Sequence, residues 1–371
     1  MKLLSLIKRL VEFLRRKYIW LFEWYSILRK RKLYKDIRWT KEQQREFDAF
    51  WKANYGRTIS NRWHKLYQCI NGHFDIQYFP EVMFTSRLEP RWNRIDYCKV
   101  LKDKGFLYSM YGRLDCMRLP KNKMLFAGKY CYDEQHQIVP KEVAMEKLAD
   151  VGPAVLKPTV AHGSGRNVIV VDFQNGVDKV SGKAVVDILQ EYRTDFVVQE
   201  RIKPHPQFAK IYPKSINTLK ILTYILDGKL YHAPICLRIG SGGSWLDNIH
   251  AGGFCIAVKD DGTLGKYAYR LGYCDSSERA DRHPDTGFVY EGAVVPGIPK
   301  LIKAAYTLHG LTPNLGSVAW DFCLDEDGMP VLIEANYKSN SIWFPQVSHE
   351  QPVFGENTAC ILQFLKRGYL K

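Results

Sequence analysis

The sequence has 371 residues, of which 46% are hydrophobic and 13% aromatic, and this composition excludes a disordered chain. A chain of this length can form two or three lobes, each with its own core. Its nine cysteines occur singly, without a CxxC pair or a metal-ligand spacing, so we expect no disulfide framework and a cytoplasmic location.

The formal net charge of +15 is unevenly distributed along the chain. Residues 1–40 carry twelve Lys/Arg and three Asp/Glu, a charge of +9, and the other 331 residues carry 42 and 36, a charge of +6. The larger part of the chain is therefore only mildly basic, which suits a nucleotide ligand and predicts no nucleic-acid partner.

The first thirty residues predict an amphipathic helix. Apolar residues recur there at intervals of three and four, at Leu3, Ile7, Leu10, Leu14, Tyr18, Leu21, Tyr25 and Leu28. Cations interrupt the apolar runs, which are far shorter than the ~20 residues of a membrane span, so we expect no spanning segment and no signal peptide. Two interpretations stay open for residues 1–40: contact with an anionic membrane surface, or packing against the body of the protein or a partner.

The pattern changes near residue 121. Residues 40–120 are rich in aromatic and charged residues, with helical spacing in places. Beyond them, short apolar runs separated by turn residues predict antiparallel hairpins, with helices near 182–193 and 296–309. We therefore expect an α+β fold and not a doubly wound sheet.

Two carboxylates lie on the predicted hairpin 317–336. A two-residue turn at Asp327-Gly328 pairs residues whose numbers sum to 655, so Asp321 faces Glu334 at about 5 Å, and Asn336 lies on the same face. Such carboxylates repel each other unless a cation joins them, and Mg²⁺ takes these oxygen ligands and keeps positions for phosphate oxygens. The alternative is a hairpin with one solvated polar face.

A glycine-containing loop separates the predicted strands 154–157 and 167–172. Gly163 and Gly165 allow backbone N–H groups to turn toward an anion, and Ser164 adds a hydroxyl donor. Lys157 ends the first strand, where it can reach the same phosphates. A loop of this kind is by itself more often only a turn, and no Walker motif is present.

Two cations interrupt the apolar hairpin 215–239, where long basic side chains need an anionic partner. Simple pairing around Asp227-Gly228 places Arg238 opposite Asn217 and Lys220 opposite Ile235, which puts the two cations on opposite faces. We therefore expect either a bulge or only one cation at the site, with Arg238 the better candidate.

In this order, the segments resemble the ATP-grasp superfamily and, within it, the sugar-transfer-associated group, with a more distant similarity to ribosomal-protein glutamate ligases. The resemblance covers about residues 120–340, and the Asp–x12–Glu–x–Asn array that ends at Asn336 is its most specific element. It implies an ATP-grasp fold, in which two α/β lobes with antiparallel sheets clamp ATP, after an N-terminal helical extension. We predict four segments: a basic helical extension (1–60), a mostly helical N-terminal lobe (61–120), a nucleotide lobe with the glycine loop (121–200) and a C-terminal lobe with the metal and acceptor site (201–371).

The resemblance also implies a role for each matching residue. The Mg²⁺ ions would be held by Asp321, Glu334 and Asn336. The ATP phosphates would be contacted by Lys157, by Lys123 or its rival Lys129, and by a lid of Gly163, Ser164 and Gly165. The adenine would lie against Gln199, Glu200 and Ile202. The transferred phosphoryl group would be neutralised by Arg238 and Asn248 and, where an arginine is usual, by Lys220.

Three functions are compatible with these residues. The first is an ADP-forming ligase that joins a carboxylate to an amine through an acyl phosphate, with a sugar acid, amino sugar or amino acid of glycan biosynthesis as reactant. The second is an ATP-grasp kinase that phosphorylates a sugar or alcohol. The third is a non-catalytic adaptor that the basic N-terminus attaches to a membrane or to glycan machinery.

Overall fold

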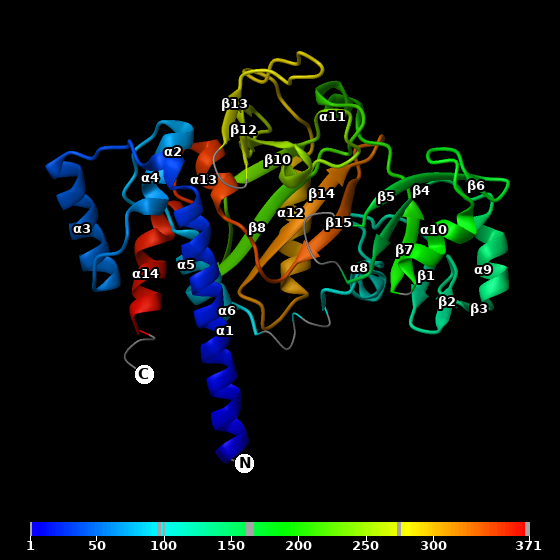
Figure 1. Cartoon of the computed structure of the whole chain (residues 1–371), viewed down its shortest axis with the longest axis horizontal. Helices are drawn as coiled ribbons and strands as arrows, with labels where there is room; N and C mark the ends of the chain where they lie inside the picture. The colour runs from blue at the N-terminus through cyan, green and yellow to red at the C-terminus, as the bar shows by residue number, and fades with distance from the viewer. Residues whose placement is uncertain are drawn as a thin grey trace.

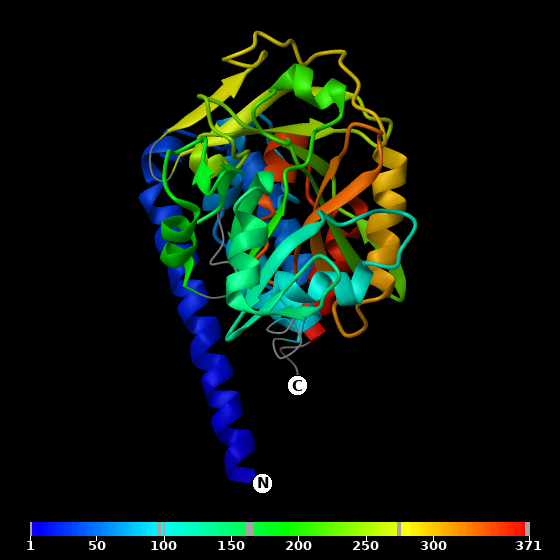
Figure 2. The same cartoon turned by 90° about the vertical axis from the view of Figure 1, so that its right-hand side faces the viewer.

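The molecule contains two antiparallel sheets: one lies in the middle of Figure 1, and the other lies at the side away from the N-terminal helices (Figures 1 and 2). The computed structural model describes residues 2–94, 98, 101–160, 167–193, 195–272 and 276–367. Its helices are α1 (Lys2–Arg29), α2 (Arg31–Tyr34), α3 (Lys41–Tyr55), α4 (Arg62–Asn71), α5 (Glu81–Met83), α6 (Glu89–Trp92), α8 (Leu107–Tyr111), α9 (Lys141–Leu148), α10 (Val185–Tyr192), α11 (Pro206–Ile211), α12 (Ile298–Gly310), α13 (Trp343–His349) and α14 (Thr358–Arg367). Shorter turns are the π-helical η1 (Phe84–Leu88) and the 3-10 turns η2 (Lys104–Phe106), η3 (Ile249–Ala251) and η4 (Gly355–Asn357).

The strands lie in two groups along the chain. Those of the first sheet are β1 (Asn122–Ala127), β2 (Tyr130–Tyr132), β3 (Ile138–Val139), β4 (Gly152–Pro158), β5 (Ile169–Gln174), β6 (Val177–Asp178) and β7 (Phe196–Glu200). Those of the second are β8 (Leu219–Leu226), β9 (Lys229–His232), β10 (Ile235–Ile239), β11 (Phe254–Val258), β12 (Leu264–Leu271), β13 (Ser277–Ala280), β14 (Ser317–Leu324) and β15 (Pro330–Asn336). The predicted α+β class is confirmed.

The first sheet has the strand order β3-β2-β1-β7-β4-β5-β6. Residues of α9 and α10 share its core with the inward side chains of the strands, and Phe126 stacks on Phe196 with ring centroids 4.3 Å apart. The glycine loop expected at 163–165 lies outside the described residues. The strands on either side of it pair as predicted, with Leu156 opposite Ile169.

The second sheet has the order β13-β12-β11-β10-β8-β14-β15, and β9 pairs with the far part of β8. Helix α12 covers one of its faces, and Trp320 of β14 is fully buried there, with its indole N–H donating to Thr223 at 2.8 Å. Because successive strand residues point to opposite faces, Ala319 and Asp321 lie on the other face. Asp321 thus belongs to a strand that is hydrogen-bonded to β8 on one side and to β15 on the other.

The N-terminal helices pack with the C-terminal helices on the face of the second sheet opposite α12, where the core includes Leu222, Cys255 and Ala319 (Figure 1). Helix α3 begins with a capping box, in which Thr40 and Gln43 exchange side-chain and backbone hydrogen bonds. Its buried Phe47 and Trp51 belong to the same core as Leu365 of α14. The chain therefore brings its first and last helices into one packed unit.

Helix α1 extends away from this unit toward the N-terminus (Figures 1 and 2). Ile27 is fully buried in the shared core, and Trp20 and Trp24 pack against it. The apolar residues on the other side of the helix remain exposed, including Leu14 and Tyr18. Among the described residues, α1 and all other helices are too short or too polar to cross a membrane.

Candidate active site

The hairpin of β14 and β15 places Asp321 directly opposite Glu334, as predicted. The register of the pairs between these residues and the turn differs from the expected one. Near the turn, the pairs Leu324–Pro330 and Phe322–Leu332 are one residue out of the predicted register, and an irregularity beyond Phe322 restores it. Ile333 is the extra residue of a β-bulge, and it re-aims Glu334 toward Asp321.

A second register shift brings both predicted cations to the same face. Strand β8 pairs with β9 in the expected register, but Lys220 faces Cys236 of β10 and not Ile235. The simple register was thus wrong by one residue for β10, and the irregularity that was the predicted alternative is present. Pro234 lies between β9 and β10 and has no N–H to donate, so the ladder is interrupted there and resumes one residue out of step.

Asp321 is the centre of the resulting charge cluster. Its Oδ1 lies 2.9 Å from Lys220 Nζ, and its Oδ2 lies 3.0 Å from Arg238 Nη2. Burial alone would raise the pKa of this carboxyl group, but Arg238 and Lys220 outweigh it and hold the pKa below its ordinary value. Asp321 is therefore ionised, and both predicted cations contact it.

Glu334 has a cationic partner that the sequence did not reveal. Lys104 Nζ lies 2.9 Å from Glu334 Oε1, and the Lys104 side chain is buried. The expected repulsion between the two carboxylates is thus relieved by three basic side chains. Lys104 precedes the first strand and belongs to no motif, so the sequence gives no sign of its position. In the structure, its backbone N–H donates to Thr159 and its buried ammonium lies in the cluster.

Lys157 lies beside this cluster at the end of β4. Its Nζ is 3.4 Å from the carbonyl oxygen of Ile333. Burial and the nearby Lys104 lower its pKa to about 8, against the opposing effect of Glu334. A buried ammonium that is held next to a second one favours the arrival of an anion.

These groups line one pocket of about 400 Å³ between the two sheets. The predicted residues that line it are Lys157, Gln199, Glu200, Ile202, Lys220, Arg238, Asn248, Asp321, Glu334 and Asn336. Lys104, Thr218 and Asp247 also line it. Lys123 and Lys129 do not, since Lys123 Nζ pairs with Glu134 at 2.9 Å and Lys129 is exposed beyond β1.

Arg118 holds the end of β7 against the β14–β15 turn at one side of the pocket. This arginine contacts Glu200 at the end of β7, and its Nε lies 2.8 Å from Asp325 in the β14–β15 turn. The backbone N–H of Glu200 already donates to Lys121. An adenine ring that binds to backbone groups would therefore contact the segment after Glu200, which includes the buried Ile202.

The segment 245–250 forms another wall of the pocket. Asp247 Oδ2 accepts hydrogen bonds from the backbone N–H and the hydroxyl of Thr218 at 2.6 and 2.7 Å. Asn248 Oδ1 accepts from the N–H of His250 at 2.9 Å, so the amide nitrogen is the group that an anion would contact. Gly253 packs against this segment, and a Cβ there would lie 2.6 Å from the carbonyl oxygen of Asp247 and 2.8 Å from that of Ile239.

We expect Gly253→Ala to lower the free energy of unfolding by about 1–3 kcal/mol, because backbone on two sides must move to admit the methyl group. Asp247 and Asn248 move with it, so nucleotide-dependent activity should fall as well. Chemical denaturation and ADP release measure the two effects. Gly310→Ala is the matched control, since a Cβ at Gly310 meets nothing within 4 Å; equal losses in both variants would contradict this reading of Gly253.

The segment after β15 closes the pocket and is held by a buried acid from the helical part. Ser339 and Asn340 line the pocket, and both donate their backbone N–H groups to Glu89, at 2.8 and 3.0 Å. Ser339 has a φ of 61°, in the left-handed region that favours glycine. Glu89 therefore stabilises a strained backbone at the pocket wall.

The oxygen groups at the end of the hairpin fit a magnesium ion. Asn336 Nδ2 lies 3.3 Å from Asp321 Oδ2, so the amide and both carboxylates converge. Asp321 Oδ1 carries a second lone pair beyond the one that Lys220 uses, whereas Oδ2 already accepts from both Arg238 and Asn336. In the part of the chain that the structure describes, no group of three or more His, Cys, Asp and Glu is placed to hold a metal. Two carboxylates and one amide suit Mg²⁺, which takes its remaining ligands from phosphate and water.

Comparison with known families agrees with this geometry. The sequence model of the family described as "Sugar-transfer associated ATP-grasp" matches residues 83–360, that is 278 of 371 residues. The chain belongs to the sugar-transfer associated ATP-grasp family. The predicted ATP-grasp fold with an N-terminal helical extension is confirmed, and the helices before residue 83 lie outside the match. Members of the ATP-grasp superfamily typically use ATP and Mg²⁺, and most are ADP-forming ligases.

Part of the chain is similar to solved structures of two ligases and one synthetase. An L-amino acid ligase from Bacillus licheniformis is 14% identical, with a TM-score of 0.39, over 74% of this chain and 48% of that one. A D-Ala:D-Ser ligase from Enterococcus faecalis is 15% identical, with a TM-score of 0.40, over 73% and 63%. A D-alanyl-alanine synthetase A from Vibrio cholerae is 15% identical, with a TM-score of 0.41, over 73% and 65%. The chain thus spans less than two thirds of the length of each, and a search of curated proteins finds no match.

Proposed function

We propose that this ATP-grasp protein is an ADP-forming ligase that joins a carboxylate to an amine, with ATP and Mg²⁺. The observation that carries the proposal is the cluster around Asp321 and Glu334, where two acids and an amide meet four basic side chains in one pocket. In glycan biosynthesis, to which the family's description points, the reactants would be a sugar acid, an amino sugar or an amino acid.

Each part of the pocket would have a distinct task. Asp321, Glu334 and Asn336 would hold Mg²⁺, which supplies charge neutralisation to the phosphates. Lys157 would contact the ATP phosphates from β4, and Gly163, Ser164 and Gly165 would close over them. Gln199, Glu200 and Ile202 would form the adenine side. Lys220, Arg238 and Asn248 would neutralise the charge on the group in transfer.

The reaction would proceed in two displacements. A carboxylate oxygen of the substrate attacks the γ-phosphorus of ATP, the bond to the β-phosphate oxygen breaks, and ADP leaves. The amine nitrogen then attacks the carbonyl carbon of the acyl phosphate, the bond from that carbon to the phosphate oxygen breaks, and the proton of the nitrogen passes to the departing phosphate. The basic side chains at Lys220 and Arg238 face charge that develops in both displacements.

The partners of the pocket's acids favour a carboxylate as the first nucleophile. Four carboxylates line the described part of the pocket, and Asp321, Glu334 and Glu200 are each paired with a basic side chain. The fourth, Asp247, accepts two hydrogen bonds from Thr218. An alcohol must give up its proton on attack and needs a base, whereas a carboxylate is already ionised.

Hydroxylamine trapping tests the proposal. Purified protein is incubated with Mg-ATP, hydroxylamine and a panel of sugar acids and amino acids, and ADP and hydroxamate are measured together. We expect one carboxylate to give hydroxamate in proportion to ADP, because hydroxylamine attacks an acyl phosphate. ADP release with phosphate on an alcohol and no hydroxamate would instead establish a kinase, and no Mg-ATP-dependent thermal shift at all would favour the adaptor.

A further inference from the structure

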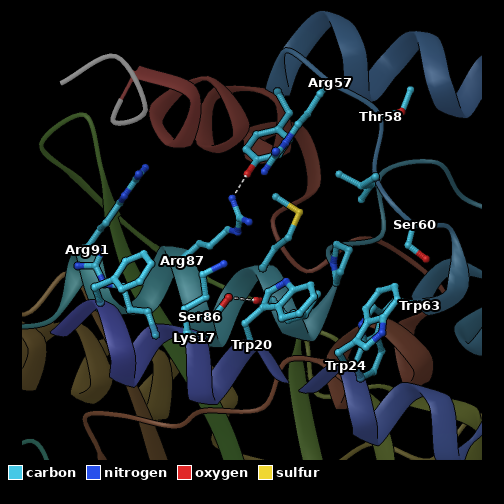
Figure 3. A pocket seen from close by; sticks show the side chains of 17 residues that line it. Lys17, Trp20, Trp24, Arg57, Thr58, Ser60, Trp63, Ser86, Arg87 and Arg91 are labelled. Atoms are coloured by element: carbon cyan, nitrogen blue, oxygen red, sulfur yellow. Dashed lines mark hydrogen bonds between the residues drawn. The ribbon is translucent and has the colours of Figure 1, made fainter. Parts of the chain in front are cut away.

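A second pocket, of about 600 Å³, lies between α1 and the helical end of the molecule (Figure 3). Among the described residues, every charged side chain that lines it is basic: Arg16, Lys17, Arg57, Arg87 and Arg91. Glu12, the ion-pair partner of Arg16, does not line it. The residues that line this pocket are distant in sequence from Asp321. None of them is among the described residues that line the first pocket, around Asp321 and Glu334.

The arginines of this pocket are held in place and repel one another. Arg87 Nη1 donates to the hydroxyl group of Tyr55 at 2.7 Å, and Arg91 Nη1 donates to the carbonyl oxygen of Leu365 at 2.8 Å. Burial lowers the pKa of Arg91, and the neighbouring Arg16 and Arg87 lower it further. Fixed guanidinium groups that share a cavity gain most from an anion with several oxygens, such as a phosphate.

The wall that α1 contributes to the pocket is aromatic as well as basic. Trp20 and Trp24 line the pocket and stack with ring centroids 5.6 Å apart, and Trp63 faces them from α4 (Figure 3). The guanidinium of Arg62 lies 4.7 Å from the ring centre of Trp24. Tryptophan beside Lys and Arg is the composition found where proteins meet the headgroup layer of a bilayer.

An exposed apolar stripe runs along the same helix. Ile7, Leu14, Tyr18, Leu21 and Tyr25 are between 50% and 69% exposed. Since successive helix residues turn by about 100°, Tyr18 and Tyr25 project from the side of α1 opposite the buried Ile27. The helix thus presents apolar residues away from the body, next to a basic and aromatic pocket.

We propose that α1 docks on an anionic membrane, with its apolar stripe among the acyl chains and the phosphate of a lipid headgroup in the basic pocket. An anionic bilayer matches both features, because it offers hydrocarbon to the stripe and phosphate to the arginines. An uncharged protein groove would match only the stripe. A free phosphate would match only the pocket.

Vesicle binding of the full chain tests this docking. Wild-type protein is sedimented with vesicles of phosphatidylcholine alone and with vesicles that also contain phosphatidylglycerol, at fixed ionic strength. We expect at least about tenfold stronger binding to the anionic vesicles. Equal binding to both kinds of vesicle, or no binding to either, would overturn the proposal.

Two double variants then separate the stripe from the pocket. Leu14→Gln with Leu21→Gln removes apolar area, and Lys17→Gln with Arg57→Gln removes charge, and all four side chains are exposed, so the fold should persist. We expect each pair to weaken anionic-vesicle binding about tenfold or more. Ile138→Gln with Val180→Gln and Lys300→Gln with Lys303→Gln make the same chemical changes elsewhere on the surface and should leave binding unchanged.

Two further outcomes would contradict the membrane proposal or its headgroup site. If the Lys300/Lys303 pair weakens binding as much as the Lys17/Arg57 pair, net charge and not the pocket attracts the membrane, and the headgroup site is wrong. If inorganic phosphate shifts the melting temperature through Lys17 and Arg57 while vesicles do not bind, the pocket serves a free anion and the membrane proposal is wrong.

Discussion

Replacement of Glu334 by glutamine is expected to lower magnesium-dependent ADP release by at least about 100-fold. The neutral amide keeps the shape of the side chain but loses the charge that would hold the cation near the phosphates. Glu334 suits this experiment because its side chain is 34% exposed, whereas Asp321 is 3% exposed and neutralises two cations. Steady-state ADP release over a range of Mg²⁺ concentrations measures the loss.

Glu326→Gln is the matched control, since Glu326 lies in the turn of the same hairpin and is 56% exposed. It should release ADP at the wild-type rate. Thermal unfolding in the absence of nucleotide should change little in Glu326→Gln, whereas Glu334→Gln should melt earlier, because it leaves the buried Lys104 without its ion-pair partner. ADP release is therefore measured well below both melting temperatures. If Glu334→Gln kept activity within about threefold of wild type, Glu334 would not be a metal ligand, and the proposed Mg²⁺ site would have to be abandoned.

Replacement of Glu89 by alanine is expected to lower the free energy of unfolding by at least about 3 kcal/mol. Glu89 is 3% exposed and accepts hydrogen bonds from two backbone N–H groups and from the Asn340 amide. Each buried donor that is left without an acceptor costs about 1–3 kcal/mol. Because Ser339 and Asn340 line the pocket around Asp321, where we propose that ATP binds, the Michaelis constant for ATP should rise as well. Urea denaturation and ATP kinetics measure the two effects.

Glu89→Gln is the control, because it keeps one oxygen acceptor, and it should recover most of both losses. It also tests a pH dependence. Burial raises the pKa of Glu89 from 4.5 to about 7, against the hydrogen bonds from Asn340 and Ser339. The folded chain therefore binds this proton more tightly than the unfolded chain, so its stabilising contribution is complete below about pH 4.5 and is lost as the pH rises to about 7. Wild type should lose more stability between these values than Glu89→Gln, and equal slopes would contradict the shifted pKa.

The hairpin around Asp321 could be predicted from the sequence because strand alternation and a turn residue pair are local properties. The pairing with Glu334 was correct, although the pairs next to the turn are one residue out of the predicted register and the bulge at Ile333 compensates for it. Bulges depend on how a strand twists against its neighbours. A single strand's composition does not contain that information.

Lys104 shows what could not be predicted. It lies more than 200 residues from Glu334 in the sequence, and the segment around it has no spacing or motif that distinguishes its ammonium from that of a surface lysine. It is placed in the pocket by its backbone hydrogen bond to Thr159, just after β4, and by its ion pair with Glu334. In the same way, the apolar spacing of residues 3–28 predicted the helix α1. It did not show that one side would contact the body while the other stayed exposed.

The shared core of α3 and α14 has a consequence for how the protein is made. Phe47 and Trp51 are synthesised about 300 residues before Leu365, their partner in that core. This core can therefore close only once α14 has been synthesised and has left the ribosome. Until then the early helix displays aromatic surface, which makes the nascent chain a client for chaperones.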